Sequence, residues 1–276
     1  MLTLWSILQQ TLIQFVSLFG VFMIGGAILT LLSRWTNNAF RQFLFPDFGM
    51  YAFGSIGVPV HEFCHALFCK LFFHEVGKVK WFDPAAKGGA HGSVTHYYNP
   101  WNLYHRIGHF FIGLGPAILG PLILGILFYA LVPAGRGVFQ WTDGNWYALV
   151  PLIKALVKAL VHPATVTSPL FYLFLYLALC ISSQIELSNE DIKQAAQGIV
   201  PLLIVLLLAN IFAWAIGFGW HARVMKIGTL TMMTGAGVFI FASMLSALNL
   251  ALCTALFGVI NRLSGRPGIN PFRANS

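Results

Sequence analysis

Charged side chains are scarce in this chain of 276 residues, which holds 16 Lys and Arg but only 8 Asp and Glu. They make up 9% of the sequence, whereas soluble domains carry about 25%. Hydrophobic residues reach 58%, and the mean hydropathy is +0.76. This balance excludes a chain built around a large water-soluble domain and predicts a polytopic membrane protein, with the lipid bilayer as a partner.

Three other features that the sequence lacks further limit the class of protein. The net charge of +8 is not concentrated in any long or dense basic run, so it favours membrane anchors and cytoplasmic loops over nucleic-acid binding. The chain has only four cysteines, all in apolar segments, which excludes a disulfide framework. The N-terminus lacks the basic region of a cleaved signal peptide, and the compact apolar chain favours the bacterial cytoplasmic membrane.

Six apolar segments approach the roughly 20 residues that cross a bilayer. They lie at about residues 5–33, 49–73, 107–132, 168–187, 198–219 and 229–259. We therefore predict an all-α membrane protein with about six transmembrane helices in a single domain, 1–276. The segment 145–161 places Lys154 and Lys158 one helical turn apart and favours an amphipathic helix on the membrane surface, although a seventh span is the alternative.

The loop after the second apolar segment has the pattern of a small β-hairpin. Its runs "VGKVKWF" and "AHGSVTHYY" alternate as strands do. The intervening "DPAAKGG" contains the Pro and Gly that favour a turn. We expect this hairpin at about 76–98, directly after the apolar segment 49–73.

The stretch "VPVHEFCHALF" holds the pattern H-E-x-x-H inside an apolar segment, where ionisable side chains are costly. On a helix, His61 and His65 share one face and can bind zinc, while Glu62 can take a proton from a zinc-bound water. The alternative is a polar contact between packed helices. Cys64, inside the pattern, could also ligate a metal, although buried packing is its favoured role.

Catalytic zinc generally takes three protein ligands and leaves a fourth position for water. The acidic cluster "IELSNEDIKQAAQG", 185–198, ends a later apolar segment. We favour Asp191 as the third ligand, with Glu186 as the alternative. Ser188 followed by Asp191 also resembles a capping box, and the two roles of Asp191 are compatible.

The remaining histidines give a weaker signal. His105 and His109 share a helical face, and His91 and His96 lie in the predicted hairpin. A second metal site is the less favoured interpretation, because histidines at the interface or packed between helices are more common.

The order of these parts resembles the site-2 protease family of intramembrane zinc metalloproteases. The matching features are the H-E-x-x-H span, a membrane-associated hairpin, a span that opens with Gly115 and Pro116, and a later span with Asp191. They cover about residues 49–198, the metalloprotease core, with 1–48 and 199–276 as accessory helices. The chain departs from the family by lacking Pro and Gly around Asp191 and by having Leu119 where the family often has Asn, which indicates a divergent member.

The resemblance implies an intramembrane zinc endopeptidase that cuts membrane-protein substrates in or near their transmembrane segments. His61, His65 and Asp191 would hold Zn²⁺, and Glu62 would act as the general base. Three alternatives remain: an inactive scaffold or metal-binding relative, a transporter that uses intramembrane His and carboxylates, and a prenyl-protein-type zinc protease.

Overall fold

The computed structural model describes residues 4–84, 86, 91–138, 147 and 149–273. Helices dominate this part of the chain: α1 (Leu4–Gln42), α2 (Pro46–Gly49), α3 (Ser55–Leu71), α4 (Leu103–Gly113), α5 (Gly115–Leu131), α6 (Leu149–Leu160), α7 (Pro163–Val166), α8 (Pro169–Ser182), α9 (Asn189–Ala215) and α10 (Trp220–Leu263). A π-helical turn, η1 (Met50–Gly54), precedes α3, and a 3₁₀ turn, η2 (Pro133–Gly135), follows α5.

Three helices, α1, α9 and α10, are long and apolar enough to cross a bilayer. The pair α4 and α5 would count as a fourth span, although the two helices are bent by 58° relative to each other. These helices make the chain a membrane protein. The segments expected at 49–73 and 168–187 instead form α3, with 17 residues, and α8, with 14 residues. By helix length, the described chain therefore offers three or four spans where the sequence predicted six.

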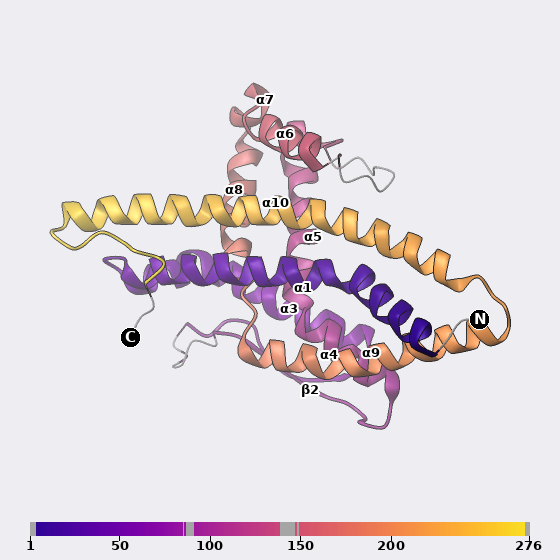
Figure 1. Ribbon diagram of the computed structural model, residues 1–276. Coiled ribbons are helices and arrows are strands. Elements are labelled where there is room, and N and C mark those ends of the chain that lie inside the picture. The colour runs from indigo at the N-terminus through magenta and orange to yellow at the C-terminus, as the bar shows by residue number, and fades with distance from the viewer. Residues whose placement is uncertain (1–3, 85, 87–90, 139–146, 148, 274–276) are drawn as a thin grey trace.

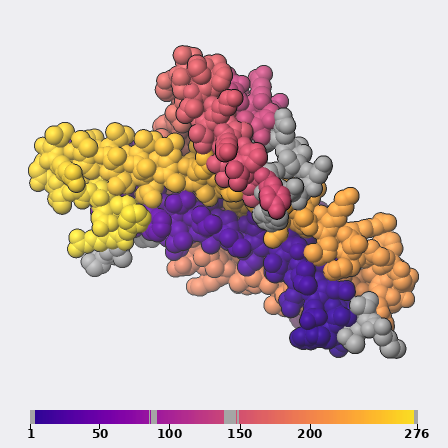
Figure 2. Space-filling view, turned by 45° about the horizontal axis from the view of Figure 1, so that its top comes forward, coloured from indigo at the N-terminus to yellow at the C-terminus, as the bar shows by residue number. Residues whose placement is uncertain are grey.

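The long helices α1, α9 and α10 run side by side, and α5 and α8 cross them steeply (Figure 1). The indigo surface of α1 lies along the yellow and orange surface of α10, and α6 and α7 project from this layer (Figure 2). Helix α6 falls within the segment predicted as amphipathic, of which residues 145, 146 and 148 lie outside the described residues. Its position on a membrane surface stays a prediction.

The main apolar core lies where α5 and α8 cross α1 and α10. Leu29, Leu124, Phe128, Phe174 and Phe241 are all fully enclosed there. Burying side chains of this size contributes about 1.5–3 kcal/mol each in water. Within the bilayer, the same contacts act through close packing, because lipid is also apolar. This crossing fixes the end of α8, and therefore the loop that leads from α8 into α9.

The predicted β-hairpin is confirmed as an antiparallel pair. Strand β1 (Glu75–Lys80) pairs with β2 (Ser93–Tyr97), and the register is irregular between Val76 and Val79. Most of the turn predicted at "DPAAKGG" lies outside the described residues. Because the hairpin follows α3 directly, β2 returns the chain to the side of α3 that carries the histidines.

Helices α4 and α9 approach each other closely at Gly113. A Cβ atom on Gly113 would collide with the backbone oxygen of Asp191 and with the backbone nitrogen of Ala195. Glycine alone leaves room for this contact. The first turn of α9 is thereby placed against the end of α4, which brings Asp191 toward α3.

Candidate metal centre

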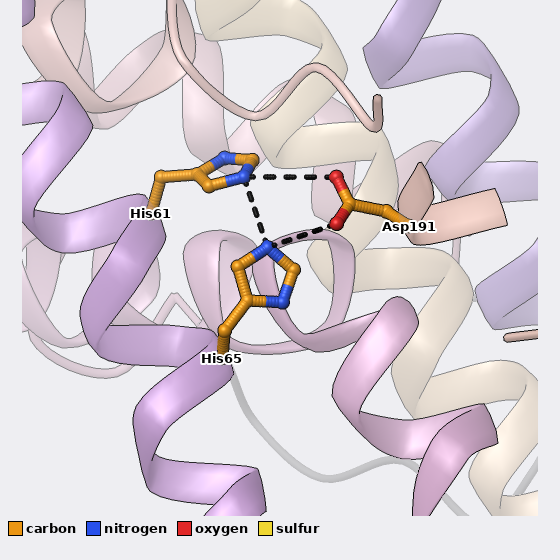
Figure 3. A group of neighbouring side chains, drawn as sticks. All are labelled: His61, His65 and Asp191. Carbon is orange, nitrogen blue, oxygen red and sulfur yellow. Dashed lines mark hydrogen bonds and ion pairs between the residues drawn. The ribbon is translucent and has the colours of Figure 1, made fainter. Parts of the chain in front are cut away.

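His61 and His65 project from one face of α3 toward the same point (Figure 3). Their Nε2 atoms lie 3.1 Å apart, and their ring centres are 4.8 Å apart. The spacing of four residues produces this convergence, as the sequence predicted. His65 is 7% exposed and the His61 side chain 15%, so protein covers most of both rings.

Backbone carbonyls hold the other nitrogen of each ring. His61 Nδ1 lies 2.7 Å from the oxygen of Gln184, and His65 Nδ1 lies 2.8 Å from the oxygen of Ile112. A carbonyl can only accept, so each Nδ1 carries the proton and each Nε2 keeps its lone pair. Histidines that bind metals are oriented in this way by an outer hydrogen bond.

Asp191 completes the group from the first turn of α9. The backbone N–H of Ser188 donates to Asp191 Oδ2 over 2.8 Å, and the backbone N–H of Asp191 donates to Ser188 Oγ over 3.1 Å. These two bonds form the capping box that the sequence predicted. Asp191 Oδ1 lies 3.3 Å from His65 Nε2, and Oδ2 lies 3.8 Å from His61 Nε2.

These three side chains could hold a metal ion. One ligand atom from each lies within 4.8 Å of the others, and no other His, Cys, Asp or Glu group in the described ranges meets this condition. Two ligands of a tetrahedral zinc, each about 2.0–2.1 Å from the ion, lie about 3.4 Å apart. The 3.1 Å between the histidine nitrogens is close to this value, and the nearest oxygen of Asp191 to each nitrogen lies at 3.3 Å for His65 and 3.8 Å for His61, so the group can take a metal ion without a large movement.

Glu62 and the three candidate ligands line one cavity of about 610 Å³. Glu62 is only 6% exposed, because the hairpin covers it. A Cβ atom on Gly92 would lie 2.6 Å from the Glu62 side chain, so the backbone just before β2 rests against this carboxylate. The cavity thus places an acid–base group beside the candidate metal ligands.

The alternative ligand, Glu186, lines the same cavity but is held by other partners. Arg34 Nε donates to it over 3.0 Å, and Asn37 Nδ2 donates over 3.3 Å. Cys64 is 1% exposed and lies outside the group that could bind a metal. The geometry favours Asp191 over Glu186 and gives Cys64 a packing position.

Sequence reasoning missed the carbonyls of Gln184 and Ile112, which orient the histidines. A backbone carbonyl has no sequence signature, so only the fold reveals them. The sequence motifs also do not single out His74, whose ring packs against those of His96, His105 and His109 in the structure.

The fold and this site define a mostly helical membrane protein with a candidate His–His–Asp metal centre. No protein-family model, curated protein or solved structure matches the chain.

Proposed function

We propose that this protein is an intramembrane zinc endopeptidase. The observation that carries the proposal is the meeting of the H-E-x-x-H residues of α3 with Asp191 of α9 on one cavity of about 610 Å³. The resemblance to site-2 proteases supports the same activity.

The donor set fits zinc. Two neutral imidazoles and one carboxylate form a common set of three protein ligands for catalytic Zn²⁺, and the fourth position stays open for water. When bound, zinc supplies a Lewis acid that lowers the pKa of that water to about 7. Oxygen-only sites suit magnesium or calcium better, so two imidazoles argue for a transition metal.

Glu62 performs the proton transfers in this proposal. It follows His61 on α3, and its carboxylate faces the cavity with the ligands. There it takes a proton from the attacking water and then delivers a proton to the leaving amine, as a general base and then a general acid. The Gly92 backbone packs against Glu62, so it shields this side chain from bulk water and holds the carboxylate beside the candidate metal ligands.

In this proposal the cavity takes an extended segment of the substrate. Residues Ser93 and Val94 of β2 form part of its lining, so the strand can offer backbone hydrogen bonds to a substrate segment. A substrate helix must first unwind, because helical hydrogen bonds shield its peptide bonds. The substrates we propose are membrane proteins cut in or near a transmembrane segment, and the compact apolar chain suits a bacterial cytoplasmic membrane.

Glu62→Gln tests the proposal. The amide keeps the shape of the side chain but cannot take the proton, so we expect cleavage to fall at least about 100-fold while zinc content is unchanged. Cleavage of a panel of single-span membrane proteins in detergent, read by mass spectrometry, provides the measurement. Glu190→Gln is the matched control, because Glu190 is an exposed carboxylate on the same cavity.

Two results would contradict the proposal. One is unchanged cleavage by Glu62→Gln. The other is a wild type that holds zinc yet cuts nothing in the panel, which would support the metal-binding relative that does not cleave.

A further inference from the structure

A second histidine cluster lies where the hairpin meets α4. The His74 ring centre is 4.9 Å from that of His96, 5.2 Å from that of His105 and 5.3 Å from that of His109. Four of the nine histidines of the chain therefore meet in one place. The proposed peptidase chemistry uses none of them.

The pair His74 and His96 repeats the geometry of the candidate metal centre. Their Nδ1 atoms are joined by a hydrogen bond of 2.9 Å, which a shared metal ion would replace. In the pair His61 and His65 the facing Nε2 atoms lie 3.1 Å apart, and the ring centres are 4.8 Å apart. Both nitrogen–nitrogen distances are close to the roughly 3.4 Å that separates two ligand atoms on one zinc ion.

The outer ring nitrogens of His74 and His96 are also placed like those of His61 and His65, beside hydrogen-bonding groups. His74 Nε2 donates to the carbonyl oxygen of His105 over 2.9 Å. His96 Nε2 lies 2.8 Å from the side-chain amide of Gln194, which can present its oxygen after a half turn. Each ring can then carry its proton on the outer nitrogen and point a lone pair inward, as metal-binding histidines do.

His109 provides the third imidazole. It is 5% exposed, and neither of its ring nitrogens has a hydrogen-bond partner among the described residues. Its ring centre lies 5.3 Å from that of His74 and 6.0 Å from that of His96. Three imidazoles on one zinc have ring centres about 5.2 Å apart. As the rings stand, these three side chains do not meet the 4.8 Å condition that His61, His65 and Asp191 satisfy, so the site requires the His109 ring to turn toward the pair, which breaks no hydrogen bond of His109.

We propose that His74, His96 and His109 form a second site for Zn²⁺ or a similar late first-row divalent cation. Such a metal would fasten the hairpin to α4, and its ligands are distinct from those of the first centre.

The protonation state of the hairpin histidines supports this. Burial, together with the nearby His74, His109 and His65, lowers the pKa of His96 to about 4, and burial lowers the pKa of His74. A lowered pKa favours the neutral imidazole, which is the form that binds metals.

Zinc analysis of two variants tests the second site. His65→Ala removes a ligand of the first centre only, so we expect about one zinc per chain to remain after purification in zinc. Adding His109→Phe should remove that zinc as well. Phenylalanine keeps the ring packing against Tyr98, where the centres are 4.3 Å apart, and removes no hydrogen bond of His109, so the fold should persist.

His162→Phe is the control, because His162 is an exposed histidine remote in sequence from the cluster. Loss of all zinc in His65→Ala, or equal zinc in His65→Ala and His65→Ala/His109→Phe, would overturn the second site.

A Co²⁺ titration of the chelator-stripped protein measures the number of metal sites independently, and it does not require a variant that lacks the first centre. We expect the wild type to take up two equivalents and His109→Phe to take up one. One equivalent in both would also refute the second site. Neither measurement depends on cleavage, so the outcome is separate from that of the proposed peptidase.

Discussion

At the scale of single residues, Asp191 links the folding of α9 to the candidate metal centre. Its Oδ2 accepts the Ser188 N–H of the capping box, while its Oδ1 faces His65. A helix start is a rigid platform, because the cap fixes both the backbone and the side chain. The acidic side chain is thereby aimed at the histidines before a metal arrives.

Asp191→Asn should separate these two roles. The amide oxygen can still accept the Ser188 N–H, so helix α9 should form, but the charged ligand is lost. We expect zinc affinity at the first centre to fall by more than about tenfold, the smallest loss typical of an outer-shell partner. Competition with a chromophoric chelator measures this, with His109→Phe present in every sample so that the first centre is read alone.

Glu186→Gln is the companion variant to Asp191→Asn. It weakens the contact with Arg34 but leaves the proposed ligands in place, so zinc affinity should stay near that of the wild type. Weak zinc binding in Glu186→Gln together with normal binding in Asp191→Asn would reverse the assignment of the third ligand.

Residue patterns predicted each half of the candidate centre, because each half is local. The spacing of His61 and His65 and the Ser188–Asp191 capping box each depend on a single helix turn. The group of His74, His96 and His109 is different, because it forms only when the hairpin folds back onto α4. No local pattern specifies that contact, so the sequence could name the histidines of the hairpin and of α4 without joining them.

At the scale of helices and strands, the candidate centre depends on the close approach of α4 and α9. Gly113→Ala tests this, because its Cβ would collide with the backbone of Asp191 and Ala195. Overpacking of this kind costs about 1–3 kcal/mol. We expect a lower thermal midpoint in detergent and weaker zinc binding, because the first turn of α9 must move away from α3.

Gly125→Ala is the matched control on α5. A Cβ atom there meets nothing within 4 Å, and alanine is the better helix former by about 0.5–1 kcal/mol. Its midpoint should be unchanged or higher. Equal effects of the two substitutions would show that the approach at Gly113 does not position the centre.

Breaks between helices explain why the observed helices are shorter than the apolar segments from which the spans were predicted. The apolar run 107–132 contains the bend between α4 and α5, which falls at Leu114. The run 49–73 passes through the π-helical turn η1 before α3 begins. Hydropathy measures where a chain is apolar, but it does not register such breaks. The hairpin was predictable, because strand alternation and turn residues are local signals.

At the scale of the whole molecule, the length of α1 and α10 limits how they lie in a bilayer. With 39 and 44 residues, they extend over about 58 and 66 Å, roughly twice the thickness of the hydrocarbon layer. They must therefore tilt or extend beyond it. A tilted bundle needs contacts that fix how its helices lie against each other, and apolar packing is weakly directional.

A buried amide pair supplies one such contact between α1 and α9. Gln14 is fully buried and Asn210 is 5% exposed. Gln14 Nε2 donates to Asn210 Oδ1 over 3.1 Å, and Asn210 Nδ2 donates to Gln14 Oε1 over 2.8 Å. Hydrogen bonds between helices in membranes average about 0.6 kcal/mol, and a buried group left without its partner costs about 1–3 kcal/mol.

A double-mutant cycle on this pair tests whether it fixes α1 against α9. We expect Gln14→Leu to lower the free energy of unfolding by about 1–2 kcal/mol, because the Asn210 amide loses its main partner. Gln14→Leu/Asn210→Leu should recover part of that loss, since it removes both amides of the pair; Thr11 Oγ1 still donates to the Ile7 carbonyl, and only the contact with His221 Nδ1 is lost in addition. Gln9→Leu, at an exposed position on the same helix, should have little effect. Unfolding in mixed detergent micelles measures each value. If the effects of Gln14→Leu and Asn210→Leu simply add, the two amides act independently and the orientation of α1 depends on its packing along α10.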